Sequence, residues 1–215
     1  KSPGAHIHCD AVQGYMRVPF TPASLGVDTL SVSAHKIYAP KGAAALYVSQ
    51  DTIRKKRIIP ILYGGGQEGG LRSGTENVPA IAAFGAAARE GMLEADARAE
   101  KVSGLHDFLI GKLSGLVQIN TPKCGADAIV NITLPSIKSE VMLRALSAKG
   151  ICVSAGSACS ARAKKISRPL LAFGLNEREA DCSLRISLSY QNTEEELTVF
   201  CDALEQELHR LARMR

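Results

Sequence analysis

An acidic residue and a lysine stand near the start of the chain, in positions where they could act together. Asp10 closes one short apolar segment, Lys36 follows another, and Ser33 and His35 precede the lysine. An acid and a lysine at the ends of neighbouring strands either form a plain salt bridge or serve a pyridoxal phosphate site. That cofactor needs a lysine for covalent attachment, an anion beside its pyridine nitrogen, and hydroxyl and imidazole groups for its phosphate.

Two further residues could do chemistry in the second half of the chain. Cys159 lies among small residues in the segment 156–162. A thiolate there would be a nucleophile, whereas a lone cysteine is by default a small buried hydrophobe. Arg185 presents a guanidinium, which binds a carboxylate through two parallel hydrogen bonds. From the residues alone, the preferred interpretation of Arg185 is a surface cation paired with Asp181 or Glu179.

The elements that must position the first group are strands. Three short apolar segments predict strands of an α/β sheet buried on both faces, and 58–63 is a fourth, weaker candidate. The three segments are 7–12, 28–34 and 43–48. Because ligands in open α/β sheets bind at the carboxyl ends of strands, Asp10 and Lys36 lie at the expected edge. The glycine-rich residues 64–77 read as a loop.

A helical pattern from 78 to about 113 is expected to break near Gly104 and to bridge two domains. Beyond it we expect an α+β unit, with domains 1–92 and 93–215. Ser139 is expected to cap a helix that ends at Gly150. Strands are expected at 129–134, 151–154 and 184–188, and a capping box at Thr193 opens the last helix.

Composition narrows the class of protein. The 215 residues carry a formal net charge of +5, with 46% apolar and 22% charged residues, an ordinary globular composition. This excludes a disordered tail, a coiled coil, a collagen-like chain and a membrane-spanning segment. With no Trp and 5% aromatic residues, a stacking platform for single-stranded nucleic acid is disfavoured. The basic runs at 54–57 and 164–165 are interpreted as solvated surface rather than a nucleic-acid patch.

The six cysteines follow no disulfide or metal-binding spacing. They stand at positions 9, 124, 152, 159, 182 and 201, and we expect reduced thiols in a cytoplasmic protein. Four of them are expected to be small buried hydrophobes: Cys124, Cys152, Cys182 and Cys201. The sequence His6-Ile7-His8-Cys9 superficially resembles a metal cluster. Strand alternation would send both histidines to one face and Cys9 to the other, so packed strand residues are favoured over zinc.

Five motifs together resemble cysteine desulfurases of the NifS/IscS type, which are fold-type I pyridoxal-phosphate enzymes of the class V aminotransferase group. They are the residues 10–13 (DAVQ), 33–42 (SAHKIYAPKG), 72–77 (RSGTEN), 154–160 (SAGSACS) and 183–188 (SLRISL). The resemblance implies an α/β fold. The chain would hold the C-terminal part of the large cofactor-binding domain, with a mainly parallel sheet, followed by a smaller α+β domain.

The resemblance also implies a role for each matching residue around the cofactor. Lys36 would hold pyridoxal phosphate covalently and move protons at the substrate carbons. Asp10 would pair with the pyridine nitrogen, and Gln13 with the ring hydroxyl. Ser33 and His35 would hold the phosphate, and His35 also counts among the candidate catalytic residues.

Three further roles concern the substrate and a second subunit. Cys159 would attack the sulfur of cofactor-bound L-cysteine, leaving a persulfide and alanine. Arg185 would bind the substrate carboxylate. Thr75 would reach the phosphate of the other subunit's cofactor, which implies a homodimer. The sulfur would pass to partner proteins for iron–sulfur cluster assembly or RNA thiolation.

The family chain is longer on its N-terminal side, and this chain begins with Lys-Ser-Pro immediately before a strand. We therefore expect a fragment, whose missing half is supplied by another chain or by a longer parent. The alternatives are a selenocysteine lyase, another class V aminotransferase, or a non-catalytic fragment for dimerisation or partner contact.

Overall fold

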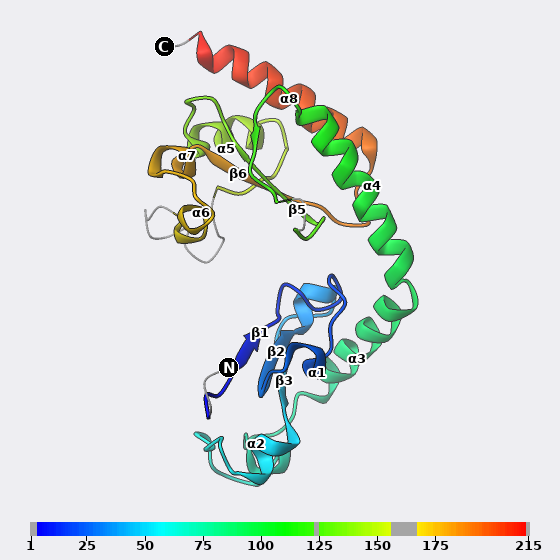
Figure 1. Cartoon of the computed structure of the whole chain (residues 1–215). Helices are drawn as coiled ribbons and strands as arrows, with labels where there is room; N and C mark the ends of the chain where they lie inside the picture. Colours follow the sequence, from blue (N-terminus) through cyan, green and yellow to red (C-terminus); the bar gives the residue numbers. More distant parts are fainter. Residues whose placement is uncertain (1–3, 123–124, 156–166, 214–215) are drawn as a thin grey trace. The chain divides into compact units, whose positions relative to one another are not determined.

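The computed structural model describes residues 4–122, 125–155 and 167–213. The chain divides into two compact units, 1–95 and 96–215. Each unit is described by itself below, with the elements labelled in Figure 1. That the two units are a cofactor-binding portion and a small domain stays a prediction.

The first unit is built on a three-stranded sheet in the order β1-β2-β3. The strands are β1 (His8–Asp10), β2 (Thr29–Ser33) and β3 (Ala44–Val48), as the apolar segments predicted. The expected burial on both sheet faces is wrong for β1 and β3 in this structure, because most of their residues are exposed. β1 and β2 are parallel, but β2 and β3 are antiparallel. Only residues 34–43 connect β2 to β3, which is too short for the crossover that a parallel pair needs. The expectation of a mainly parallel sheet thus holds for one of these two strand pairs.

The helices of this unit are mostly short. They are α1 (Pro22–Leu25), η1 (Ala34–Ile37), α2 (Gln50–Arg54), η2 (Glu68–Gly70) and α3 (Val78–Leu93). A small buried cluster of Ala11, Leu30 and Val32 joins β1 to β2, and Phe84 of α3 packs against it.

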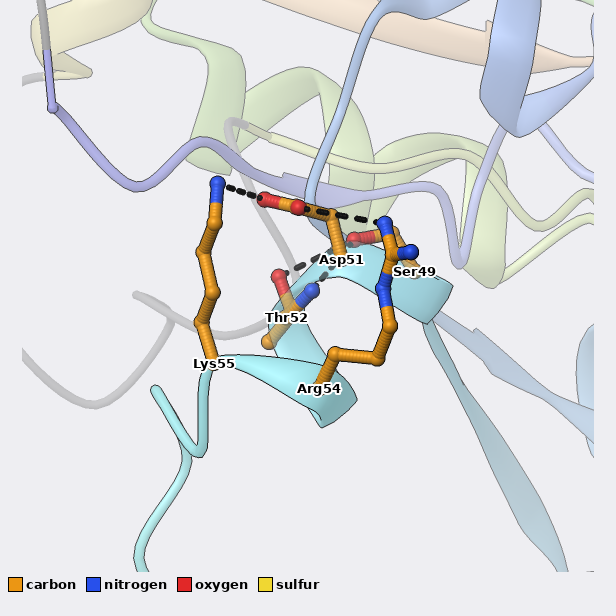
Figure 2. Close-up of polar contacts among 5 residues, drawn as sticks. All are labelled: Ser49, Asp51, Thr52, Arg54 and Lys55. Carbon is orange, nitrogen blue, oxygen red and sulfur yellow. Dashed lines mark hydrogen bonds and ion pairs between the residues drawn. The ribbon is translucent and has the colours of Figure 1, made fainter.

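Local polar contacts stabilise α2, whose last residue, Arg54, is the first of the basic run at 54–57 (Figure 2). Ser49 caps the helix, because its Oγ accepts the Thr52 N–H at 3.2 Å. Asp51 pairs with Lys55 at 2.9 Å and with Arg54 at 3.5 Å, and the Lys55 hydrogen bond holds the pKa of Asp51 below its ordinary value. The side chains at 54–57 are exposed, as expected of a solvated surface.

The candidate strand at 58–63 is wrong. This segment is irregular, and Ile59, Ile61 and Tyr63 are 77–89% exposed. Pro60 lacks the N–H that a ladder needs, and no strand of the described residues pairs with the segment.

The long helical pattern breaks at Glu94 rather than near Gly104. α3 ends at Leu93, and α4 (Ala95–Leu113) runs through Gly104 without interruption. A glycine costs a helix only about 1 kcal/mol. The packing of Leu105, Leu109 and Leu113 in the core of the second unit stabilises α4 beyond that position.

The second unit is an antiparallel sheet, β4-β5-β6, packed against helices. Its strands are β4 (Gln118–Ile119), β5 (Ile129–Thr133) and β6 (Ser183–Ser187). Its helices beyond α4 are α5 (Ser139–Ser147), α6 (Arg168–Ala172), α7 (Glu177–Asp181) and α8 (Glu194–Ala212). Side chains of one sheet face join α4, α5 and α8 in a large core that includes Val130, Ile132, Leu184 and Leu204, all fully buried.

Three local predictions meet different outcomes here. The capping box of α8 is confirmed, since Thr193 Oγ1 accepts the Glu196 N–H and Glu196 Oε2 accepts the Thr193 N–H. The cap of α5 is Lys138, not Ser139, and that helix ends at Ser147. The expected strand at 151–154 is irregular apart from one bridge, described below.

Candidate active site

The parallel pairing of β1 and β2 places two predicted site residues at the same sheet edge. Asp10 is the last residue of β1, and β2 ends at Ser33, two residues beyond Ser31, the partner of Asp10. The exposed Asp10 carboxylate accepts the Val12 N–H at 3.0 Å. Gln13 lies in the turn that follows, with its side chain exposed.

The turn η1 presents the lysine beside a hydroxyl and an imidazole. Ser33 Oγ and His35 Nδ1 are 2.9 Å apart. Ala34 and Ile37, three residues apart and so on one side of this 3-10 turn, are buried and anchor it, whereas His35 is exposed. Lys36 is half-buried, and within the described residues no carboxylate pairs with its amine. Asp10 and Lys36 therefore form no salt bridge there, and a cationic or reactive amine is left available.

His6 and His8 lie on one strand face, as alternation predicted. His6 Nε2 and His8 Nδ1 are each 2.9 Å from Thr29 Oγ1. Cys9 packs on the other side, against the small core of this unit. The part of the chain that the structure describes contains no group of three or more His, Cys, Asp or Glu side chains placed to hold a metal ion.

Thr75 lies in an exposed stretch between η2 and α3. Neighbouring side chains shape this stretch: Gln67 Oε1 accepts the Gly74 N–H at 3.1 Å, and Asn77 caps α3. Thr75 is thus presented on the surface of the first unit.

Arg185 belongs to the second unit and lies between two neutral polar residues. The main-chain N–H of Arg185 donates to Ser154 O at 2.7 Å, and the main-chain N–H of Ser154 donates to Arg185 O at 3.1 Å. On the other side, Asn131 of β5 is its register partner. The guanidinium donates to Ser154 Oγ at 3.4 Å, while the buried Nε has no hydrogen-bond partner among the residues that the structure describes.

The alternative of a surface ion pair for Arg185 is wrong. Asp181 pairs with Lys138 at 3.4 Å, and Glu179 Oε2 accepts the Asn176 N–H at 2.8 Å in a capping box. Within the described residues, neither of these carboxylates pairs with Arg185. Sequence reasoning missed Ser154 and Asn131 as its neighbours, because their proximity depends on strand register.

Cys159 lies outside the described residues, as does Cys124. Of the other cysteines, Cys182 and Cys201 are buried as expected, and burial raises the pKa of the Cys201 thiol to about 11. Cys152 was expected to be buried but is exposed. Since 151–154 forms no regular strand, nothing turns that side chain inward.

Comparison with known proteins finds a family profile and individual proteins that are similar in sequence to this chain. The sequence profile described as Aminotransferase class-V matches residues 1–200. A protein named cysteine desulfurase IscS from Anaeromyxobacter dehalogenans is 36% identical over 215 residues, covering 98% of this chain and 52% of that protein. Cysteine desulfurase IscS 1 from Archaeoglobus fulgidus is 35% identical over 213 residues, covering 98% of this chain and 55% of that protein.

Solved structures agree with these sequences. A NifS-like protein from Rickettsia africae matches with a TM-score of 0.83 and 35% identity, over 95% of this chain and 54% of that chain. Another NifS-like protein matches with a TM-score of 0.84 and 34% identity, over 97% and 54%. These likenesses confirm the predicted fold class. The chain spans about half the length of the curated relatives it matches.

No helix of the described residues combines the length and the apolar character that crossing a membrane requires.

Proposed function

Because this chain belongs to the class V aminotransferase family and resembles its cysteine desulfurases, we propose that it carries the lysine, substrate arginine and nucleophile of a pyridoxal-phosphate-dependent cysteine desulfurase. The observation that carries this proposal is the edge formed by Asp10, the Ser33–His35 contact and Lys36, whose amine pairs with no carboxylate of the described residues. An anion, a hydroxyl, an imidazole and a lysine are the groups that this cofactor requires.

The residues of that edge fit the cofactor in kind. Asp10 supplies a carboxylate for a protonated ring nitrogen, and the exposed amide of Gln13 suits a ring hydroxyl. Ser33 and His35, 2.9 Å apart, supply two groups for a phosphate. When bound, pyridoxal phosphate would withdraw electrons from the substrate and so make its carbon–hydrogen bonds acidic. Lys36 would hold the cofactor and carry the proton between the substrate carbons.

Arg185 supplies the contact that would orient the amino acid. Its guanidinium has no carboxylate partner in the described residues, and its buried Nε is unpaired. A buried donor without a partner costs about 1–3 kcal/mol, which a substrate carboxylate oxygen would offset.

The sulfur step assigned to Cys159 balances without an external oxidant. Its thiolate attacks the sulfur of L-cysteine, a sulfur–sulfur bond forms and the substrate Cβ–S bond breaks. The electron pair of that bond stays with the carbon, which takes up a proton and leaves as alanine. Cys159 keeps the persulfide.

The remaining assignments belong to the same proposal. Thr75, exposed beside α3, would reach the phosphate site of a second subunit in a homodimer. The half of the family chain that this sequence lacks would come from a longer parent or a companion chain. The persulfide sulfur would pass to acceptors for iron–sulfur assembly or RNA thiolation in the cytoplasm.

The decisive experiment treats the purified chain, with any companion polypeptide it retains, with pyridoxal phosphate and borohydride. Intact and peptide mass analysis should find a cofactor adduct on Lys36, absent in Lys36→Ala and present in the control Lys41→Ala. With L-cysteine and a reductant, alanine and sulfide should form in equal amounts. Cys159→Ser should abolish both and keep the adduct.

Other results would redirect the proposal. Sulfide release that survives Cys159→Ser would contradict the nucleophile assignment. Faster turnover of selenocysteine than of cysteine would favour a selenocysteine lyase, and amino transfer from alanine would favour another class V aminotransferase. Failure to form the adduct with the complementary half present would favour a non-catalytic partner or dimerisation fragment.

A further inference from the structure

We propose that Asn131 and Ser154 are positioning residues for Arg185: two neutral side chains that hold its strand from both sides and leave its charge free for the substrate carboxylate. This inference rests on the proposed function, in which Arg185 binds an amino acid. It adds two residues that hold the arginine in position and do not themselves touch the substrate.

The backbone places both residues directly beside the arginine. Arg185 exchanges both of its main-chain hydrogen bonds with Ser154, so it has none left for β5. Asn131 and Arg185 are therefore a non-hydrogen-bonded antiparallel pair, the kind in which opposite side chains approach most closely. Residues directly opposite each other share a sheet face, so Asn131, Arg185 and Ser154 form one row across the sheet.

The orientation of the Asn131 amide follows from its partners. The Leu184 carbonyl, which only accepts, lies 3.1 Å from Asn131 Nδ2, so the amide nitrogen must face β6. Asn131 Oδ1 then faces Asn120, whose Nδ2 donates to it at 2.7 Å. The amide thus turns a donor, not an acceptor, toward the strand of Arg185.

A chain of neutral groups continues from Asn120 to Ser183, the first residue of β6. Asn120 Nδ2 also donates to Thr133 Oγ1 at 2.8 Å. Thr133 and Ser183 hydroxyls are 3.1 Å apart, and Ser183 donates to the Glu179 carbonyl at 2.8 Å. Both ends of the chain are backbone carbonyls flanking the start of β6, and these bonds fix the register of the strand that carries Arg185.

Neutrality matters because the guanidinium is partly buried. The two flanking side chains are an amide and a hydroxyl, and the next two along the face, Thr133 and Ser183, are hydroxyls. A carboxylate in the row would pair with the guanidinium and compete with the substrate for it. It would also lose the donor that Asn131 gives to Leu184 O.

The test compares Asn131→Asp, which keeps the shape but replaces the amide donor with a charged oxygen, with Asn131→Ala, which removes both side-chain hydrogen bonds of Asn131 and adds no charge. Asn192→Asp is the matched control, because Asn192 lies in the loop before α8 and bonds to Ser189 N–H and Glu196. The probe is L-alanine, an amino acid with no sulfur to transfer. The readouts are its dissociation constant by calorimetry on the cofactor-loaded protein and the NMR signal of the Arg185 Nε–H.

We expect Asn131→Asp to weaken L-alanine binding about tenfold or more, and Asn131→Ala by less than about threefold. The Arg185 Nε–H signal should shift in Asn131→Asp before any ligand is added, and Asn192→Asp should match the unaltered chain. Ser154→Asp places a carboxylate on the other side of the row. It should weaken binding similarly, and it keeps the test decisive if Asn131→Asp does not fold.

Equal losses in Asn131→Asp and Asn131→Ala would overturn the inference, because a merely structural role makes no distinction of charge. Unchanged binding in Ser154→Asp would also overturn it. Failure of the proposed function gives a different pattern, in which Arg185→Leu leaves L-alanine binding unchanged.

Discussion

Lys149 and Glu207 form an ion pair, with 3.2 Å between Nζ and Oε1, that joins the segment after α5 to α8. The Glu207 side chain is only 7% exposed, and its other oxygen accepts from Arg210 Nε at 2.6 Å. The hydrogen bond from Arg210, together with that from Lys149, holds the pKa of Glu207 below its ordinary value. The charged carboxylate therefore stabilises the second unit.

Because of this pair, the free energy of unfolding of the second unit should fall as the pH becomes acidic. Since the pKa of Glu207 is lower in the folded chain, its contribution is full above the ordinary glutamate pKa of about 4.3 and is lost as the pH falls through the folded value. Glu207→Gln should lower the free energy of unfolding at pH 7 by on the order of 1 kcal/mol and flatten the decline in acid. Urea unfolding from pH 7 to pH 3 measures both. The control Glu205→Gln, on the exposed side of α8, should change neither, and a parallel acid decline in Glu207→Gln would contradict the assignment.

The Ser33–His35 contact predicts a loss of cofactor affinity. Ser33→Ala removes one phosphate group and the partner that holds the His35 ring, so pyridoxal phosphate should dissociate about tenfold more readily. Fluorescence titration after dialysis gives the dissociation constant. Ser31→Ala, two residues earlier on the same strand face, is the matched control. Equal affinities in the two variants would remove Ser33 from the cofactor site.

The described cysteines should differ widely in reactivity. With a pKa of about 11, Cys201 holds about one thiolate per thousand molecules at pH 8, and its side chain is buried. The exposed Cys152 should therefore react with N-ethylmaleimide at least about a hundredfold faster than Cys201. Peptide mass analysis over time measures both rates, and in denaturant they should converge.

The position of Cys152 also matters for any experiment that identifies the proposed nucleophile, Cys159. Cys152 and Cys159 fall in the same tryptic peptide, 150–162, so a persulfide found there must be located by fragmentation. Faster labelling of Cys201 than of Cys152 would contradict the burial described for both.

A core substitution should act within one unit. Leu204 is fully buried in the second unit, and Leu204→Ala should cost about 2–5 kcal/mol there. Hydrogen exchange followed by mass spectrometry should show lost protection in β5 and β6, with β1 and β2 unchanged. The exposed Val199→Ala on the same helix is the control. Loss of protection in β1 and β2 as well would contradict separate cores.

Local pattern predicted much of the fold. Short apolar segments located β1, β2 and β3, strand alternation predicted the shared face of His6 and His8, and the Thr193 capping box located α8. Predictions that depended on distant partners failed: 58–63 is apolar yet pairs with no strand of the described residues, and Glu94 rather than Gly104 interrupts the helices.

The candidate site likewise contains one group of residues that the sequence predicts and one that it does not. Ser33, His35 and Lys36 are neighbours in sequence, so their grouping at a strand end could be predicted. The row Asn131–Arg185–Ser154 joins residues from three parts of the chain. Only strand register brings them together, and no local signal in the sequence carries that register.

Each buried cluster draws its side chains from a single unit. Free-energy changes at sites without shared contacts add to within about 0.3–0.5 kcal/mol. A double-mutant cycle between Ser33 and Arg185 should therefore close to zero when unfolding is measured on the chain without ligand. The same cycle with cofactor and amino acid bound then measures what binding adds to the coupling between the two positions.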